Sequence, residues 1–178
     1  MNTPEPLMRP LETPRLVLEP QVAAHADEMF IVLSDPAIYE FENAPPVSVE
    51  ALRERYRALE ARRSPDGRQL WLNWTVRLKD GDLAIGYVQA TVLPDAAALV
   101  AYEFNSACWG RGLAHEAVVA AMREMRQHLG VTRFGAVFKT ANVRSHQLLA
   151  RLGMRPAAGG QFPSELVEAG ESAMAIIP

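Results

Sequence analysis

The sequence predicts a single α/β domain built on a mixed, mostly antiparallel sheet. Three observations predict this class. Strand-like segments joined by short turns run from residue 70 to residue 104, a helix–strand–helix pattern follows from 113 to 152, and no linker or repeat divides the chain. With 178 residues, the chain is long enough to bury one hydrophobic core without disulfides or metal ions.

The first residues are expected to stand apart from this domain. Residues 1–14 are rich in proline and are interpreted as an extended leader, so we expect ordered structure to begin near Arg15 and the domain to span residues 15–178. The leader lacks the basic-then-apolar pattern of a signal peptide, and no stretch approaches about eighteen consecutive apolar residues. These features argue against a signal peptide and against a membrane span.

The first part of the domain is expected to hold one strand and two helices. A short strand is expected at residues 16–18, and apolar residues at 26, 29, 30 and 33 give residues 23–33 a helical spacing. Residues 36–47 combine prolines with aromatic residues, which favours a loop that lines a pocket. Ser48 is suited to cap a helix whose apolar residues at 49, 52, 56 and 59 share one face.

The remaining elements alternate in type. Residues 71–78 and 83–93 form a predicted hairpin, and residues 97–104 extend it into an antiparallel meander. A helix over 113–129, a strand over 133–138, a helix over 142–152 with Asn142 as its N-cap and Gly153 at its end, and a last strand over 172–177 complete the expected order.

Composition excludes several classes of function. The 18 basic and 21 acidic residues give a net charge of -3 without a long run of one sign, so no nucleic acid partner is expected. Cys108 has no partner for an internal disulfide, and the four histidines lack metal-ligand spacing, so no metal site is expected. A reducing cytoplasm is therefore the expected location.

The most informative motif is the glycine loop WGRGLA at residues 109–114, which lies between a predicted strand and a predicted helix. Its glycines let the backbone approach an anion, and the following helix directs unpaired N–H groups and its positive dipole end toward that anion. A triphosphate-binding loop is excluded because Leu113 and Ala114 stand where Lys-Ser or Lys-Thr is needed. A dinucleotide fingerprint is disfavoured because His115 occupies its third small position and no acidic residue ends the next strand.

A second segment, from residue 142 to residue 153, makes this loop one half of a pair. Together they resemble the acetyl-coenzyme A (acetyl-CoA) binding motif of the GNAT superfamily of N-acetyltransferases. Trp109 stands at the motif's glutamine or arginine position, and Gly112 and Ala114 stand at its small positions. The WGRG run, the opening TPRLVL at 13–18, and the NVRS and LGM runs are most similar to the branch of ribosomal-protein N-terminal acetyltransferases. The resemblance covers roughly residues 13–156.

This resemblance implies an architecture and a donor. It implies the GNAT fold, with six or seven strands, helices on both faces, and a splay between the fourth and fifth strands, residues 97–104 and 133–138. Acetyl-CoA is the expected cosubstrate, its pantetheine arm pairing with the backbone exposed at the splay and its pyrophosphate held by the loop. The residues expected to bind it are Phe104, Asn105, Trp109, Gly110, Arg111, Gly112, Leu113, Ala114, Asn142 and Ser145.

Acetyl transfer needs a neutral amine, stabilisation of an oxyanion, and a proton for the departing thiolate. Glu103 is the candidate base; the competing interpretation is an exposed or salt-bridged strand carboxylate. Many family members have a tyrosine four residues after Ser145, but Leu149 stands there, which leaves the Ser145 hydroxyl as the candidate acid. Its competing interpretation is a small residue that lets the helix pack or that binds the coenzyme. A backbone N–H near Phe104 is the expected oxyanion donor.

The acceptor is expected to be a primary amine, on a protein N-terminus or on a small molecule. Tyr39, Glu42 and Trp74 are the candidate acceptor residues, and the acidic Glu40, Glu42 and Glu103 suit a cationic amine. The competing interpretation is a packed loop for Tyr39 and Glu42 and the hydrophobic core for Trp74. The alternative function is a non-catalytic acyl-CoA-binding sensor or regulatory module of the same fold. Both a monomer and a homodimer are compatible with the sequence.

Overall fold

The computed structural model describes residues 7–41, 43–157 and 167–176, and in them eight strands form one sheet in the order β1-β2-β3-β4-β5-β6-β8-β7. The strands are β1 (Leu11–Glu12), β2 (Leu16–Pro20), β3 (Leu70–Leu78), β4 (Ala84–Val92), β5 (Ala97–Phe104), β6 (Arg133–Lys139), β7 (Arg155–Pro156) and β8 (Glu171–Ile176). The helices are α1 (Ala26–Leu33), α2 (Val49–Leu59), α3 (Leu113–Leu129) and α4 (Val143–Arg151), with short 3-10 turns at Ala23–His25, Pro36–Tyr39 and Ser106–Cys108.

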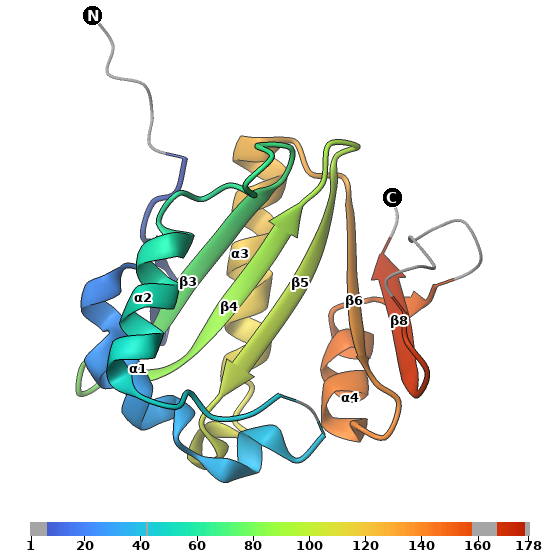
Figure 1. Cartoon of the computed structure of the whole chain (residues 1–178). Helices are drawn as coiled ribbons and strands as arrows, with labels where there is room; N and C mark the ends of the chain where they lie inside the picture. Colours follow the sequence, from blue (N-terminus) through green and yellow to red (C-terminus); the bar gives the residue numbers. More distant parts are fainter. Residues whose placement is uncertain (1–6, 42, 158–166, 177–178) are drawn as a thin grey trace, which may run out of the picture.

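The predicted mixed, mostly antiparallel sheet with helices on both faces is confirmed (Figure 1). β5 and β6 form its parallel pair, and the other neighbouring strands are antiparallel. The described chain has more strands than the expected six or seven because β1 and β7, of two residues each, extend the edges. No helix in these residues is both long and apolar enough to cross a membrane.

Ordered structure begins before Arg15, which corrects the expected boundary of the leader. β1 pairs with β2, with Leu11 opposite Leu18, and the side chains of Met8 and Leu11 are buried in the main core. Burial of these apolar side chains offsets the entropy lost when the segment is fixed. The rest of the predicted leader, residues 1–6, lies outside the described residues.

The two faces of the sheet carry separate hydrophobic cores. On one face, α3 and α4 pack on the strands through residues such as Val118, Leu149 and Trp74. On the other face, α1 and α2 pack through residues such as Met29 and Leu52. Because side chains alternate along a strand, consecutive residues of β5 point toward different cores.

β5 and β6 separate along their length. Their pairing covers only residues 97–99 against residues 133–135, and the two strands diverge beyond it (Figure 1). This divergence confirms the predicted splay between residues 97–104 and 133–138. It opens the sheet next to the loop that joins β5 to α3.

Candidate active site

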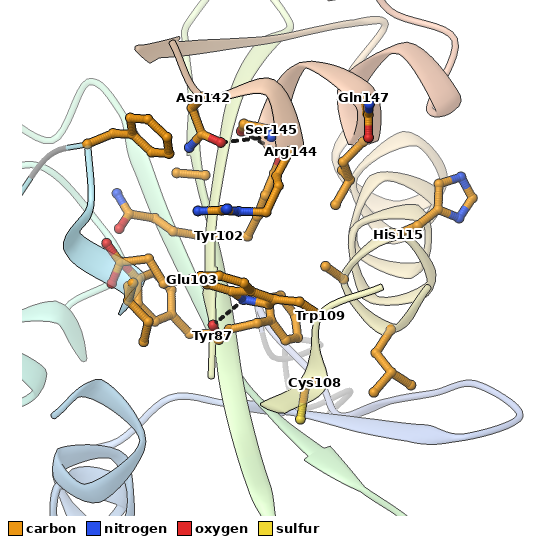
Figure 2. Close-up of a pocket in the computed structure, with 18 of the residues that line it drawn as sticks. Tyr87, Tyr102, Glu103, Cys108, Trp109, His115, Asn142, Arg144, Ser145 and Gln147 are labelled. Carbon is orange, nitrogen blue, oxygen red and sulfur yellow. Dashed lines mark hydrogen bonds between the residues drawn. The ribbon is translucent and has the colours of Figure 1, made fainter. Parts of the chain in front are cut away.

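A cavity of about 630 Å³ opens at the splay, between the loop after β5 and the N-terminal ends of α3 and α4 (Figure 2). We call it the splay cavity. Most of the residues expected to bind the donor line it, namely Phe104, Trp109, Gly110, Gly112, Leu113, Ala114, Asn142 and Ser145. Asn105 and Arg111 are not among its lining residues; the Asn105 side chain accepts a hydrogen bond from the Ala107 N–H, and Arg111 is exposed. Donor binding by these two stays a prediction.

The start of α3 brings backbone N–H groups to this cavity. Gly112 is the N-cap, no side chain caps the helix, and a 3.1 Å bond from the Glu116 N–H to the Gly112 carbonyl begins its hydrogen-bond ladder. The N–H groups of Leu113, Ala114 and His115 therefore have no partner within the helix. A helix N-terminus with unpaired N–H groups binds phosphate through those donors and through the helix dipole.

Glu116 anchors the loop to the N-terminal segment. Its carboxylate accepts hydrogen bonds from the Thr13 hydroxyl at 2.6 Å and the Arg15 N–H at 3.0 Å, and it pairs with the Arg15 guanidinium at 2.6 Å. Burial raises the pKa of Glu116, but the bonds from Thr13 and Arg15 outweigh burial and leave this pKa below its usual value. Within the loop, Gly110 and Gly112 have φ angles of 73° and 74°, a region that favours glycine.

Trp109 and Arg144 connect the loop to α4. The Trp109 Nε1 donates to the Phe104 carbonyl at 2.8 Å, and the Arg144 guanidinium lies 4.3 Å from the centre of the Trp109 ring. Arg144 also pairs with Glu40 at 2.6 Å, so it spans from α4 to the loop after α1. Sequence reasoning missed this connection, because a single arginine on an amphipathic helix gives no signal of its tertiary partners.

The backbone of β5 is directed alternately to β4 and to the splay. The Asn105 N–H donates to the Ile85 carbonyl of the β4 side at 2.9 Å. The backbone groups of Phe104 and Tyr102 therefore point the other way, toward the gap. The Phe104 carbonyl is bonded to Trp109, so the Phe104 N–H faces the gap together with the backbone groups of Tyr102. This is the position that the sequence analysis expected for the oxyanion donor.

Ser145 bonds to a tyrosine that sequence reasoning did not select. The Tyr102 hydroxyl and the Ser145 Oγ lie 2.9 Å apart, across the cavity from β5 to α4 (Figure 2). Asn142 caps α4 as predicted, accepting a bond from the Ser145 N–H at 3.0 Å, and this fixes the first turn that carries Ser145. Burial raises the pKa of Tyr102 to about 12, although its bond to Ser145 acts in the opposite direction.

A second cavity, of about 190 Å³, lies on the side of α1 and α2. We call it the polar cavity. Register places Asn73 opposite Gln89 and Tyr87 opposite Glu103, so these side chains share one face of the sheet. All four line the polar cavity. Tyr39 lines it as well, and its hydroxyl donates to the Leu33 carbonyl at 2.7 Å.

Glu103 lies where the two cavities meet. It lines both of them, together with Asn43, Arg55, Tyr87 and Gln89. The Asn43 amide donates to the Glu103 carboxylate at 3.3 Å. Burial, the negative charge of Glu103 and a hydrogen bond to it raise the pKa of the Tyr87 phenol well above its usual value. Tyr87 and Asn43 therefore orient a carboxylate that both cavities reach.

Of the predicted acceptor residues, Trp74 is corrected by the structure and Glu42 is not described by it. Trp74 is 1% exposed and belongs to the core under α3, which corrects its assignment to the acceptor site. Because side chains alternate, Asn73 and not Trp74 faces the polar cavity. Glu42 lies outside the described residues.

Four basic side chains line the splay cavity without having been selected from the sequence. They are Arg55 of α2, His115 of α3, and Arg144 and Arg151 of α4. In Figure 2, His115 lies on the far side of the cavity from Glu103 and Tyr87. The start of α3 and the α4 side of the cavity thus offer basic groups suited to phosphate, and Glu103 offers a carboxylate suited to an amine.

The amino-acid sequence decides the family. The profile of a family described as an acetyltransferase (GNAT) domain matches residues 15–155. The chain belongs to the GNAT acetyltransferase family. Acetyl-CoA is the cosubstrate of GNAT acetyltransferases, and the unpaired N–H groups and basic side chains of the splay cavity fit its phosphates.

Solved structures share the GNAT fold. Ribosomal-protein-S5-alanine acetyltransferase from Vibrio fischeri superposes with a TM-score of 0.75 at 19% identity, covering 96% of this chain and 97% of that chain. RimL, a ribosomal L7/L12 alpha-N-protein acetyltransferase in complex with coenzyme A, has a TM-score of 0.77 at 13% identity, covering 95% and 98%. A GNAT-family acetyltransferase from Bacillus anthracis has a TM-score of 0.74 at 16% identity, covering 95% and 98%. No curated protein sequence matches the chain significantly.

Proposed function

We propose that this protein transfers the acetyl group of acetyl-CoA to a primary amine by direct attack of the amine on the thioester. The observation that carries the proposal is the position of Glu103 at the junction of the splay cavity and the polar cavity. One cavity has the features of a coenzyme site, and the other reaches the same carboxylate from the opposite face of the sheet. Two cavities that meet at a candidate base suit a reaction between two bound substrates.

The donor is held by the chain's backbone and basic groups. The N–H groups of Leu113, Ala114 and His115 bind the pyrophosphate, and Arg151 adds positive charge. The pantetheine arm lies in the splay beside the β5 backbone, which places the thioester near the junction of the cavities.

Glu103 serves as the general base. It accepts a proton from the acceptor amine, directly or through a water molecule, so that the neutral nitrogen attacks the thioester carbonyl. The Asn43 amide and the Tyr87 phenol hold the carboxylate in place. As the carbonyl oxygen becomes negative, the Phe104 N–H that faces the gap stabilises it.

Ser145 and Tyr102 serve as the proton source for the thiolate. When the tetrahedral intermediate collapses, the carbon–sulfur bond breaks and the sulfur takes the proton of Ser145, while Tyr102 passes its own proton to Ser145 and water restores the phenol. Tyr102 and Glu103 are consecutive residues of a strand, so they point to opposite faces. The base and the acid therefore act on opposite sides of the reacting carbon.

The acceptor carries its amine on a protein N-terminus or on a small molecule. Acetylation of a ribosomal protein by some structural neighbours supports the first class, and the small volume of the polar cavity supports the second. Both classes present a primary amine to Glu103.

The test is acetyl-CoA-dependent thiol release with a panel of small amines and short peptides, with the acetylated product identified by mass spectrometry. We expect Glu103→Gln to lower kcat by about 100-fold or more at neutral pH while the KM for acetyl-CoA changes less than about twofold. Glu54→Gln, an exposed carboxylate on α2 outside both cavities, is the matched control. Saturable acetyl-CoA binding without thiol release for any amine would overturn the proposal and support the sensor alternative.

A further inference from the structure

We propose that the acceptor is a small amine that also carries a carboxylate, bound with its amine at Glu103 and its carboxylate at Arg55. This inference rests on the proposed acetyl transfer and specifies the acceptor of the same site. Arg55 projects from α2 and lines the polar cavity and the junction with the splay cavity, as Glu103 does from β5. Arg55 and Glu103 thus place a positive and a negative group at the polar cavity.

Arg55 differs from the neighbouring arginines of α2. Arg53 pairs with Asp27, and Arg57 pairs with Glu54, so both are neutralised on the surface. In residues 7–41, 43–157 and 167–176, no acidic side chain pairs with Arg55 and no acceptor bonds to it. An unpaired guanidinium at the wall of a cavity is a ready site for a carboxylate, which it binds through two parallel hydrogen bonds.

The charges of Arg55 and Glu103 act on the same group of phenols, in keeping with the position of both residues at the wall of the polar cavity. Burial raises the pKa of Tyr39, Tyr56 and Tyr87. For each phenol the negative charge of Glu103 adds to this rise, and the positive charge of Arg55 opposes it. The three tyrosines therefore lie within the fields of both groups.

Tyr56 supplies a second observation that points to a ligand. It is 3% exposed and lines the polar cavity, and its hydroxyl has no hydrogen-bond partner among the described residues. Buried hydroxyl groups are generally satisfied, so an unpaired one at a cavity wall indicates a polar ligand group in that cavity. A carboxylate bound at Arg55 would accept its proton.

The size and lining of the cavity restrict the acceptor further. Its volume of about 190 Å³ is smaller than the roughly 300–1,000 Å³ of sites for drug-sized ligands. Gln21, Asn73 and Gln89 give it a neutral polar wall. Glu40, which the sequence analysis counted toward a cationic acceptor, is neutralised by Arg144. The polar cavity therefore suits a compact zwitterion better than a diamine.

The experiment compares amino acids with their amides at saturating acetyl-CoA. The pairs are glycine and glycinamide, β-alanine and its amide, and γ-aminobutyrate and its amide, with thiol release as the readout. The measured quantity is the ratio of kcat/KM for the acid to kcat/KM for the amide. Because each variant is compared with the parent protein, the different basicity of the two amines cancels from this comparison.

We expect this ratio to fall about tenfold or more in Arg55→Ala, because a charge-assisted hydrogen-bond pair to the carboxylate is lost. Arg55→Lys should retain part of the preference, and Arg57→Ala, the matched surface control, should keep the parent ratio. An unchanged ratio in Arg55→Ala would overturn this inference and leave acetyl transfer intact. Failure of every acid in the set, with other amines acetylated, would also overturn it. A protein that acetylates no amine at all would refute the proposed function itself.

Discussion

Replacement of Tyr102 by phenylalanine tests whether the Tyr102–Ser145 pair moves a proton or only stabilises the fold. The two hydroxyl groups are 2.9 Å apart, and burial keeps the pKa of the phenol at about 12, so the phenol holds its proton at neutral pH. Phenylalanine fills the same space without the donor. The variant therefore removes one hydrogen bond and one exchangeable proton and leaves the packing intact.

The two roles predict losses of kcat of different size. A hydrogen bond between neutral hydroxyl groups contributes about 0.5–1.5 kcal/mol, which limits a purely structural effect to roughly tenfold. Loss of a proton donor from the transition state lowers the rate by about 10²–10⁴-fold. We expect Tyr102→Phe and Ser145→Ala each to lower kcat by about 100-fold or more, with the KM for acetyl-CoA changed less than about threefold.

The assay is steady-state thiol release with an accepted amine, combined with urea denaturation of each variant. If the two residues form one relay, the double variant is no slower than the slower single variant, because the same function is lost once. Ser172→Ala is the matched control, since Ser172 makes a comparable hydroxyl bond to Thr140 at 2.7 Å outside the splay cavity. A kcat for Tyr102→Phe within about tenfold of the parent value would refute the relay.

Three further predictions test the donor loop, the core and the electrostatics. Gly110→Ala and its control Gly67→Ala introduce a side chain into open space at nearly equal φ angles of 73° and 72°. Each should lower the free energy of unfolding by about 1–2 kcal/mol. Calorimetry should show weaker acetyl-CoA binding for Gly110→Ala alone, and equal affinities of the two variants would contradict the role of the loop in binding. Trp74→Phe should lower the free energy of unfolding by about 1–3 kcal/mol and leave the KM for the amine unchanged, whereas a raised KM would place Trp74 in the acceptor site after all. Burial lowers the pKa of His25 from 6.5 despite the opposing charges of its carboxylate neighbours. Below about pH 6.5 the unfolded chain therefore binds the extra proton, and the free energy of unfolding falls as the pH is lowered. In urea denaturation, the loss of unfolding free energy between pH 8 and pH 5.5 should be smaller for His25→Gln than for the parent protein, and an equal loss would contradict this role of His25.

The elements that could be predicted are those with strong periodicity and a local signal at each end. The helix expected over residues 113–129 has these bounds in the structure, because its apolar spacing is regular and glycines at 112 and 130 end it on both sides. The cap of α4 by Asn142 and that of α2 by Ser48 were readable for the same reason. Each of these signals depends on residues that are neighbours in the sequence.

The features that could not be predicted depend on tertiary arrangement. The bond between Tyr102 and Ser145 exists only because β5 and β6 diverge and bring α4 over the gap. For β3, alternation alone leaves open which of two faces is buried, so Trp74 was a candidate both for the core and for the acceptor site. Its neighbours on the same face, Leu72 and Val76, are apolar, whereas Asn73 and Thr75 mark the other face. Comparison of the two faces over the whole strand would have decided between the two interpretations.

The most direct test of acetyl transfer at the splay is a crystal structure of the protein with coenzyme A. We expect the pyrophosphate within hydrogen-bond distance of the N–H groups of Leu113, Ala114 and His115, with the pantetheine in the splay beside β5. We expect the sulfur between the Ser145 hydroxyl on one side and the Glu103 carboxylate on the other. A coenzyme bound outside the splay, or a sulfur out of reach of both residues, would contradict the proposed transfer.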